Sequence, residues 1–207
     1  MRIFFSFLTI ISLFLFLFTS CSKDYGTTTV EGKVVDATTG EPVPYATVSL
    51  GSRAKEVLSS GYGHKESYQA DANGNYSFSF DAISDGSYGV DAGYNDLYFS
   101  NDGYIPIDGG RKNKNIEIKI KPGGWIRFHV KDEEPRGDVA SFLVQSFISP
   151  SYVRISNPPK DTTFVVFTYG NKNEPYVYWV KINYEETKTI GEVQTKALDT
   201  VDAYIKF

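Results

Sequence analysis

The strongest constraint on the fold is a two-residue alternation of apolar and polar side chains that recurs along most of the chain. In residues 116–121, for example, three isoleucines alternate with Glu117, Lys119 and Lys121. This alternation is typical of β-strands that bury one face and expose the other. It recurs in six further segments: residues 45–50, 76–80, 126–130, 165–169, 176–184 and 201–207. We therefore expect an all-β fold in which sheets pack face to face.

Turn-forming residues divide the chain into two parts. All nine prolines lie between the alternating segments, and Pro122-Gly123-Gly124 separates two of them. Such punctuation predicts a boundary between a first domain, residues 27–122, and a second β-sandwich-like domain, residues 123–207. Only residues 185–198 have apolar side chains at helical spacing. Because Gly191 interrupts them, at most a short helix is expected there.

The composition excludes several classes of function. The 207 residues carry a net charge of −4, with one cysteine and two histidines. Nucleic-acid binding requires a basic patch, so no nucleic-acid partner is expected. One cysteine excludes an intramolecular disulfide framework and a zinc site built from several cysteines. No cofactor is predicted.

The N-terminal segment has the layout of a secretory signal peptide. Residues 3–18 are almost all Phe, Leu and Ile, and they stand between Arg2 and the small residues Thr19 and Ser20. As a helix these 16 residues would span about 24 Å, which is shorter than the ~30 Å hydrocarbon core of a bilayer. We therefore predict a cleaved signal peptide over residues 1–20 rather than a permanent transmembrane helix.

The residues Leu17-Phe18-Thr19-Ser20-Cys21 resemble the lipobox of bacterial lipoproteins, in which the cysteine is acylated and becomes the new N-terminus. An ordinary cleavage site beside Cys21 is the alternative. The resemblance implies palmitate-type acyl chains that anchor the protein to a membrane through a tether, residues 21–26. Ser22 implies the outer membrane. Lys23-Asp24 weakly resembles a surface-export signal of Bacteroidota lipoproteins, so the periplasmic and cell-surface faces both stay open.

Three segments in order resemble a carboxypeptidase-regulatory-like, or transthyretin-like, β-sandwich: VEGKVVDATTGEPVPYATVSL, DANGNYSFSF and DGSYGVDAGY. Gly40 suits a tight turn after the first strand, and Tyr76 and Phe78 are expected in the core. The resemblance implies a non-catalytic accessory domain of extracellular proteins, including nutrient-uptake systems of Bacteroidota outer membranes. Its enzymatic relatives hydrolyse 5-hydroxyisourate with a Tyr-Arg-Gly-Ser terminus, which residues 203–207 do not match.

Candidate catalytic and metal-binding residues are few. His64 and His129 are far apart in sequence and are predicted to be surface residues, and no Gly-x-Ser-x-Gly motif occurs. The pairs Glu133-Glu134 and Glu185-Glu186 are predicted to be charges in turns, so no enzyme activity is expected. Asp71, Asn73 and Asn75 alternate around a glycine and form a weak calcium candidate. In the resembled family this segment is a β-turn.

Exposed aromatic residues offer a second kind of site. Rings displayed on loops can stack on sugars, although β-sandwiches also fill their cores with aromatic residues. In the second domain, one face of a strand is predicted to carry Tyr176, Tyr178 and Tyr184, and the opposite face Trp179. The aromatic side chains on the face that meets water are a further candidate binding site. The tyrosines of the loop-rich first domain are Tyr62, Tyr68, Tyr88, Tyr94, Tyr98 and Tyr104.

These observations predict a non-catalytic outer-membrane lipoprotein that binds or scaffolds other components of an envelope assembly, with nutrient uptake as one setting. The alternative is a carbohydrate-binding lipoprotein that uses loop tyrosines. The expected partners are a membrane, through the lipid anchor, other envelope proteins and, in the alternative, glycans. Thr162 and Thr200 lie in Asp-Thr-Thr and Asp-Thr-Val sequences that resemble an O-glycosylation signal.

Overall fold

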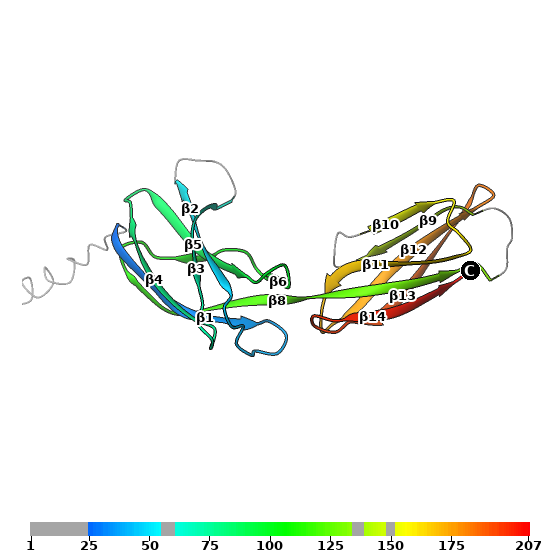
Figure 1. Ribbon diagram of the computed structural model, residues 1–207. Helices are drawn as coiled ribbons and strands as arrows, with labels where there is room; N and C mark the ends of the chain where they lie inside the picture. Colours follow the sequence, from blue (N-terminus) through cyan, green and yellow to red (C-terminus); the bar gives the residue numbers. More distant parts are fainter. Residues whose placement is uncertain (1–24, 55–60, 134–138, 148–151) are drawn as a thin grey trace, which may run out of the picture.

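The computed structural model describes residues 25–54, 61–133, 139–147 and 152–207. Within these ranges the chain forms strands and turns and no helix, which confirms the all-β prediction (Figure 1). None of the described segments is a helix with the length and hydropathy needed to cross a bilayer. The predicted signal peptide and Cys21 lie outside the described residues.

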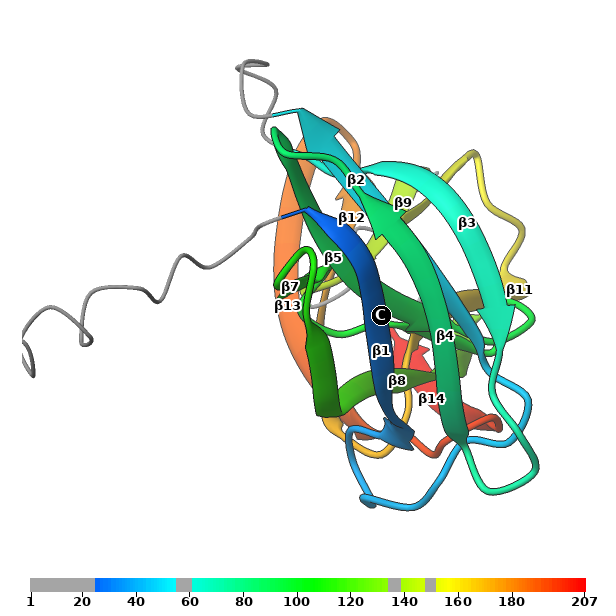
Figure 2. The same ribbon diagram turned by 90° about the vertical axis from the view of Figure 1, so that its left-hand side faces the viewer.

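A first β-sandwich contains the strands of residues 26–120. One of its sheets pairs β4 with β1 and β1 with the first half of β8 (Lys112–Lys131), to which β6 also pairs. The other sheet has the order β3-β2-β5-β7. Figure 2 views this sandwich from the N-terminal end of the molecule. Its strands are β1 (Gly26–Asp36), β2 (Thr47–Ala54), β3 (Gly63–Gln69), β4 (Asn75–Ala82), β5 (Gly86–Gly93), β6 (Tyr98–Ser100) and β7 (Ile105–Ile107).

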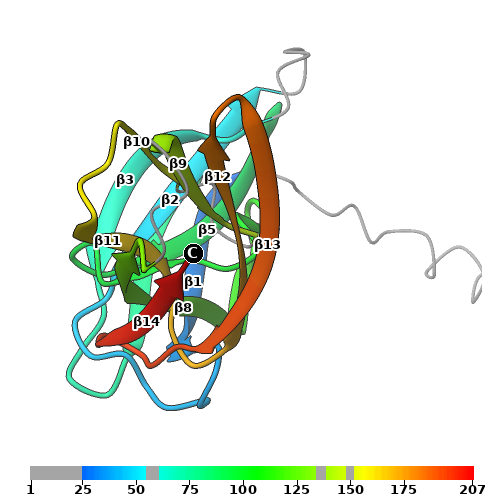
Figure 3. The ribbon, with the colours of Figure 1, turned by 90° about the vertical axis from the view of Figure 1, so that its right-hand side faces the viewer.

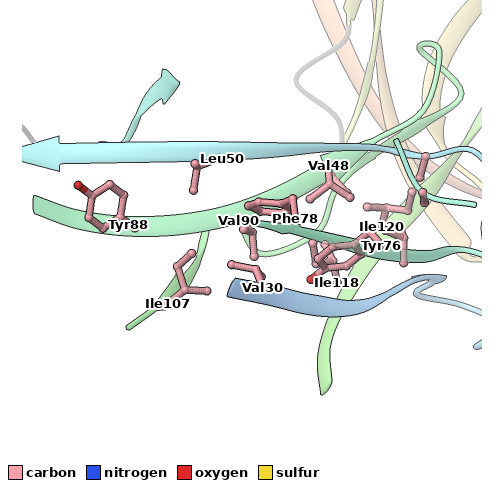
Figure 4. Close-up of a cluster of buried hydrophobic side chains, with 14 of the residues drawn as sticks. Val30, Val48, Leu50, Tyr76, Phe78, Tyr88, Val90, Ile107, Ile118 and Ile120 are labelled. Carbon is pink, nitrogen blue, oxygen red and sulfur yellow. The ribbon is translucent and has the colours of Figure 1, made fainter. Parts of the chain in front are cut away.

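The core of the first sandwich follows from the alternation in its strands. Every second residue of β4 is buried, and Tyr76 and Phe78 lie among these, as predicted (Figure 4). Phe78 is 7% exposed, and its ring stacks on that of Tyr68 with 3.9 Å between centroids. Burial of such rings between sheets is the main source of stability in a fold of this kind. Gly40 adopts a φ of 76° in the turn after β1, a conformation that favours glycine.

A second β-sandwich contains the strands that follow. Its first sheet has the second half of β8 between β11 and β14, and its second sheet has the order β10-β9-β12-β13. Figure 3 views this sandwich from the C-terminal end. Phe128 and Phe142 are its largest fully buried side chains. Its strands are β8 (Lys112–Lys131), β9 (Val139–Ser146), β10 (Tyr152–Ser156), β11 (Asp161–Tyr169), β12 (Asn173–Ile182), β13 (Glu185–Gln194) and β14 (Thr200–Lys206).

Strand β8 runs without a break through both sandwiches (Figure 1). Its 20 residues at ~3.3 Å each give a length of about 65 Å. The predicted interruption at Pro122-Gly123-Gly124 is wrong, because these residues continue the strand. The division into two domains there stays a prediction. β8 contributes Ile118 and Ile120 to the first core, and Ile126, Phe128 and Val130 to the second.

The two glycines allow close approach instead of a turn. A Cβ atom at Gly123 would lie 3.1 Å from the ring of Phe167, and one at Gly124 would lie 3.0 Å from the carbonyl oxygen of Lys196. A side chain at either position would push apart the segments that pack against the middle of β8.

The expectation of a short helix within residues 185–198 is also wrong, because residues 185–194 form β13. Ile190 and Val193 point to opposite faces of the sheet, as residues three apart do in a strand. The ring of Tyr176 lies directly over Gly191, where a Cβ atom would be 2.3 Å from the tyrosine Cζ. Pairing with β12 therefore overrides the helical spacing, and Gly191 makes room for a core side chain.

Candidate functional site

Three of the six candidate tyrosines, Tyr68, Tyr88 and Tyr98, lie in strands and belong to the first core or pack against it. Tyr88 occupies an inward-facing position of β5, is 4% exposed, and accepts a hydrogen bond from the Ile83 N–H. Tyr68 stacks on Phe78, and its hydroxyl donates to Glu66. Burial, together with that bond, raises the pKa of Tyr68 to about 12. The prediction that Tyr88 is displayed on a loop is therefore wrong.

Tyr62 and Tyr104 meet on the outer face of the β3-β2-β5-β7 sheet. Their ring centroids are 5.2 Å apart, and both side chains are half-buried. The rings lie over Gly51 and Gly89, which face each other on β2 and β5. A Cβ atom at Gly51 would be 2.5 Å from the Tyr104 ring. The two tyrosines thus cover a flat, side-chain-free part of the sheet.

Tyr94 and Tyr98, the first residue of β6, flank the turn that leads into this strand, and both pack against the first core. Each N–H donates to the other residue's carbonyl oxygen, at 3.0 and 3.1 Å. Burial is the main cause that raises the pKa of Tyr98, and the nearby Asp36 carboxylate adds to it. The six tyrosines therefore occupy three places rather than one surface, and glycan binding by them stays a prediction.

The calcium candidate is a turn stabilised by its own carboxylate. Asp71 Oδ1 accepts the backbone N–H groups of Asn73 and Asn75, both at 2.8 Å. These bonds, first the one from Asn75, lower the pKa of Asp71. Among the described residues there is no group of three or more His, Cys, Asp or Glu side chains arranged to hold a metal. Calcium binding at this turn stays a prediction.

The two histidines lie in different sandwiches. His64 is exposed on β3, whereas His129 lies on the outer face of β8. The His129 Nε2 atom is 2.7 Å from Asp202 Oδ1, which is also 3.4 Å from Arg127. The hydrogen bond to His129, and then the charge of Arg127, lower the pKa of Asp202. The His129 ring also stacks on Tyr204, so it takes part in pairing across β8 and β14.

A shallow groove of about 340 Å³ crosses this face at the far end of β8. Charged side chains line it, and Lys131 and Lys206 both lie near Glu133, with nitrogen-to-oxygen distances of 3.8 and 2.8 Å. Glu134 lies outside the described residues. Thr162 and Thr200, the candidate glycosylation sites, are both half-buried within or at the start of strands. Their modification stays a prediction.

Side chains from both sandwiches meet at the middle of β8. The Phe99 ring of β6 packs edge-on against Phe167 of β11, with 5.0 Å between centroids. The Gly170 N–H donates to the carbonyl oxygen of Pro122 at 2.9 Å, and Asn171 Nδ2 donates to Thr38 Oγ1 at 2.9 Å. These contacts, which we call the junction, lie beside the continuous strand and fix one sandwich against the other.

The outer face of the β10-β9-β12-β13 sheet carries the tryptophan. Trp179 faces away from the core, whereas Tyr176 lies in the second core and Tyr178 packs against it. Tyr184 does not share their face, because it lies in the turn after β12 and is 94% exposed. The side chains across the row through Trp179 are, in order, Arg154, Leu143, Trp179 and Lys188.

A groove of about 260 Å³ borders the ring, and we call it the Trp179 groove. The sequence identified Trp179 as a candidate, but of its neighbours it singled out only Glu186, as a charge in a turn. That prediction is wrong, because Glu186 lies in β13. The neighbours of Trp179 come from three other strands, and the register that brings them together leaves no signal in the sequence alone. The groove is lined by Ser141, Leu143, Gln145, Arg154, Trp179 and Glu186.

Comparison with known proteins shows likeness of fold only. No protein-family model matches the sequence, and no curated protein is similar to it. The shaft pilin SpaA of Lactobacillus rhamnosus GG is similar at 10% identity and a TM-score of 0.33, with 88% of this chain and 97% of the pilin covered. A streptococcal ancillary pilin is similar at 14% identity and a TM-score of 0.43, with 90% of this chain and 63% of the pilin covered.

A DUF3823 family protein from Bacteroides uniformis is also similar, at 14% identity and a TM-score of 0.30, with 83% of this chain and 99% of that protein covered. All three values are too low to carry information on activity or partners. The strands and sheets of the described residues themselves show an all-β protein with two sandwiches.

Proposed function

We propose that this protein is a non-catalytic envelope lipoprotein that holds its second sandwich away from a membrane and there binds or scaffolds other envelope components. The observation that carries the proposal is the combination of the continuous strand β8 with the packed junction. A flexible linker would leave the two sandwiches free to reorient. Here one strand belongs to both cores, and the Phe99–Phe167 contact stiffens its midpoint.

The direction of the chain supports this role. β1 begins at Gly26, five residues after the candidate anchor Cys21, and pairs in parallel with β8. Both strands therefore lead away from the N-terminal end, and the second sandwich lies at the opposite end of the molecule (Figure 1). With acyl chains on Cys21, a rigid body about 65 Å long would stand between the membrane and the far end of β8.

The lipid anchor is tested by Cys21→Ser in the full-length protein expressed in a Gram-negative host. The wild type is expected to incorporate an alkyne analogue of palmitate and to enter the detergent phase of Triton X-114. The variant should lose the label and stay in the aqueous phase. Ser22→Ala is the matched control and should keep the label. Equal labelling of wild type and Cys21→Ser would refute the anchor.

The binding role is tested separately by affinity purification of the tagged wild-type protein from detergent-solubilised envelopes. Envelope components that co-purify, and are lost when the second sandwich is disrupted by Phe142→Ala, would support scaffolding. Phe142 is fully buried in the second core, so its truncation should affect that sandwich most. If the tagged wild-type protein purifies without any other envelope component, the proposed scaffolding role is contradicted.

A further inference from the structure

We infer that the Trp179 groove is a binding site for one or two units of a neutral pyranose polysaccharide. The inference deepens the proposed function, since it names a ligand class for the second sandwich. Its test, however, requires neither the lipid nor the envelope. Trp179 is in β12, an inner strand of the sheet, and its backbone is paired on both sides, with Leu143 and Lys188.

The Trp179 ring has a neighbouring side chain on each of the two adjacent strands. Lys188 Nζ lies 5.6 Å from the ring centroid, and Leu143 is the direct cross-strand neighbour on the other side. An aromatic ring that is already ordered loses little side-chain freedom on binding. One side of a pyranose presents axial C–H groups, which are apolar and flat enough to stack on an indole. Trp179 and Leu143 supply the apolar surface for that side.

The rim of the groove supplies the polar half of the recognition. Arg154 donates hydrogen bonds, Glu186 accepts them, and Gln145 and Ser141 can do both. Sugar hydroxyls also donate and accept, so a mixed rim matches them. In the part of the chain that the structure describes, Arg154 and Glu186 form no ion pair or side-chain hydrogen bond, so both are open to a ligand.

The volume of the groove and the charges of its lining restrict the class of ligand that it can bind. The groove holds about 260 Å³, less than the ~300–1,000 Å³ of typical pockets for drug-sized ligands. Arg154 and Glu186 lie on the two edge strands, which are about 14 Å apart at the ~4.8 Å spacing of neighbouring strands, and Glu186 is offset along its strand by two residues, or ~7 Å, from the row of Arg154 and Trp179. That span suits one or two sugar rings lying across the sheet. Among the side chains that line the groove, the charges of Arg154 and Glu186 balance, which favours a neutral sugar over an acidic one; Lys188 contacts the ring but does not line the groove.

The surface next to the groove is apolar. Tyr152 and Ile190 continue the apolar face in the adjacent row, and each is 64% exposed. A longer polysaccharide could extend over them along the strands. In the groove itself, polar side chains line a hollow next to the ring.

The test uses the full-length protein in detergent and electrophoresis through gels that contain glucan, mannan, xylan, galactan or, as the acidic comparison, polygalacturonate. At least one neutral polysaccharide should retard the wild type. Trp179→Ala should weaken retention by about tenfold or more, and Glu186→Gln by a few-fold. Tyr204→Ala is the matched control. It removes a 69% exposed aromatic side chain from the opposite sheet and should leave retention unchanged.

Two measurements keep the inference falsifiable if Trp179→Ala is poorly folded. Glu186→Gln changes an exposed side chain and should not affect folding, which circular dichroism would check. Trp125→Phe leaves Trp179 as the only tryptophan, so its fluorescence should change when the retarding polysaccharide is added. Absence of retardation by every neutral polysaccharide, retardation by polygalacturonate alone, or equal retention of wild type and folded Trp179→Ala would each overturn the inference.

Discussion

Replacement of Gly32 by alanine tests the register on which the first sandwich depends. Gly32 pairs with Ile116 at an irregularity where β1 meets β8, and the Tyr76 hydroxyl crosses over it to donate to the Ile116 carbonyl oxygen at 3.0 Å. A Cβ atom at position 32 would lie 1.9 Å from that oxygen and 2.7 Å from the Tyr76 hydroxyl. An ordinary contact is at least 3.4 Å, so β8 would have to shift by about 1.5 Å.

The expected cost follows from what that shift breaks. Overpacking in a closely packed site costs about 1–3 kcal/mol, and loss of the Tyr76 hydrogen bond adds about 1 kcal/mol. We therefore expect Gly32→Ala to lower the free energy of unfolding by about 3 kcal/mol. For a chain of this size the melting temperature would fall by roughly 6–12 °C. Urea denaturation followed by circular dichroism gives the free energy directly.

Gly63→Ala is the matched control for this prediction. Gly63 is also a strand residue, but a Cβ atom there would meet nothing closer than the Ser52 carbonyl oxygen at 3.6 Å. Its stability should stay within about 0.5 kcal/mol of the wild type. Tyr76→Phe should cost about 1 kcal/mol and should lose part of its effect when combined with Gly32→Ala. If Gly32→Ala is as stable as Gly63→Ala, the pairing of β1 with β8 described above is wrong.

Two further predictions concern the first core. Phe78→Ala should lower the free energy of unfolding by about 3–5 kcal/mol, because the ring is almost fully buried and stacks on Tyr68. Thermal unfolding measures this loss. Val165→Ala, at an exposed position, is the control and should lower the stability far less. In spectrophotometric titration, Tyr68 should ionise near pH 12 and Tyr68→Phe should remove that step. The raised pKa means that the folded state favours the neutral phenol of Tyr68. The contribution of this neutral phenol to the free energy of unfolding is therefore fully present below pH ~10, the ordinary pKa of tyrosine, and is lost as the pH rises through about 12. A titration step near pH 10 for Tyr68 would contradict the combined effect of its partial burial and its hydrogen bond to Glu66.

The alternation of side chains predicted β2, β4, β8, β11, β12 and β14, because it reports directly which face of a strand is buried. Tyr76 and Phe78 were placed in the core for that reason, and the structure agrees. Glycine was the residue type that misled. Gly191 and the pair Gly123-Gly124 indicated interruptions, yet each lies inside a strand where a ring or a backbone segment approaches closely. That reason is tertiary, so the local sequence does not contain it.

The candidate sites were less predictable than the strands. Aromatic density near loops predicted one tyrosine surface, but Tyr88 lies at an inward-facing strand position and the others divide among separate places. Conversely, the Trp179 groove combines Arg154, Leu143 and Glu186 from different strands. Their meeting depends on strand order and register, which are set by the whole sheet. The alternation within one strand shows which way a side chain points but not what lies beside it.

The parallel pairing of β1 with β8 bears on how the molecule would respond to tension. If the chain is held at its N-terminus and pulled at the second sandwich, β1 is drawn one way and β8 the other, along their common direction. The hydrogen bonds between them are then sheared together instead of being opened one after another. Rupture would require many bonds to fail at once, so the protein is built to bear load along its long axis.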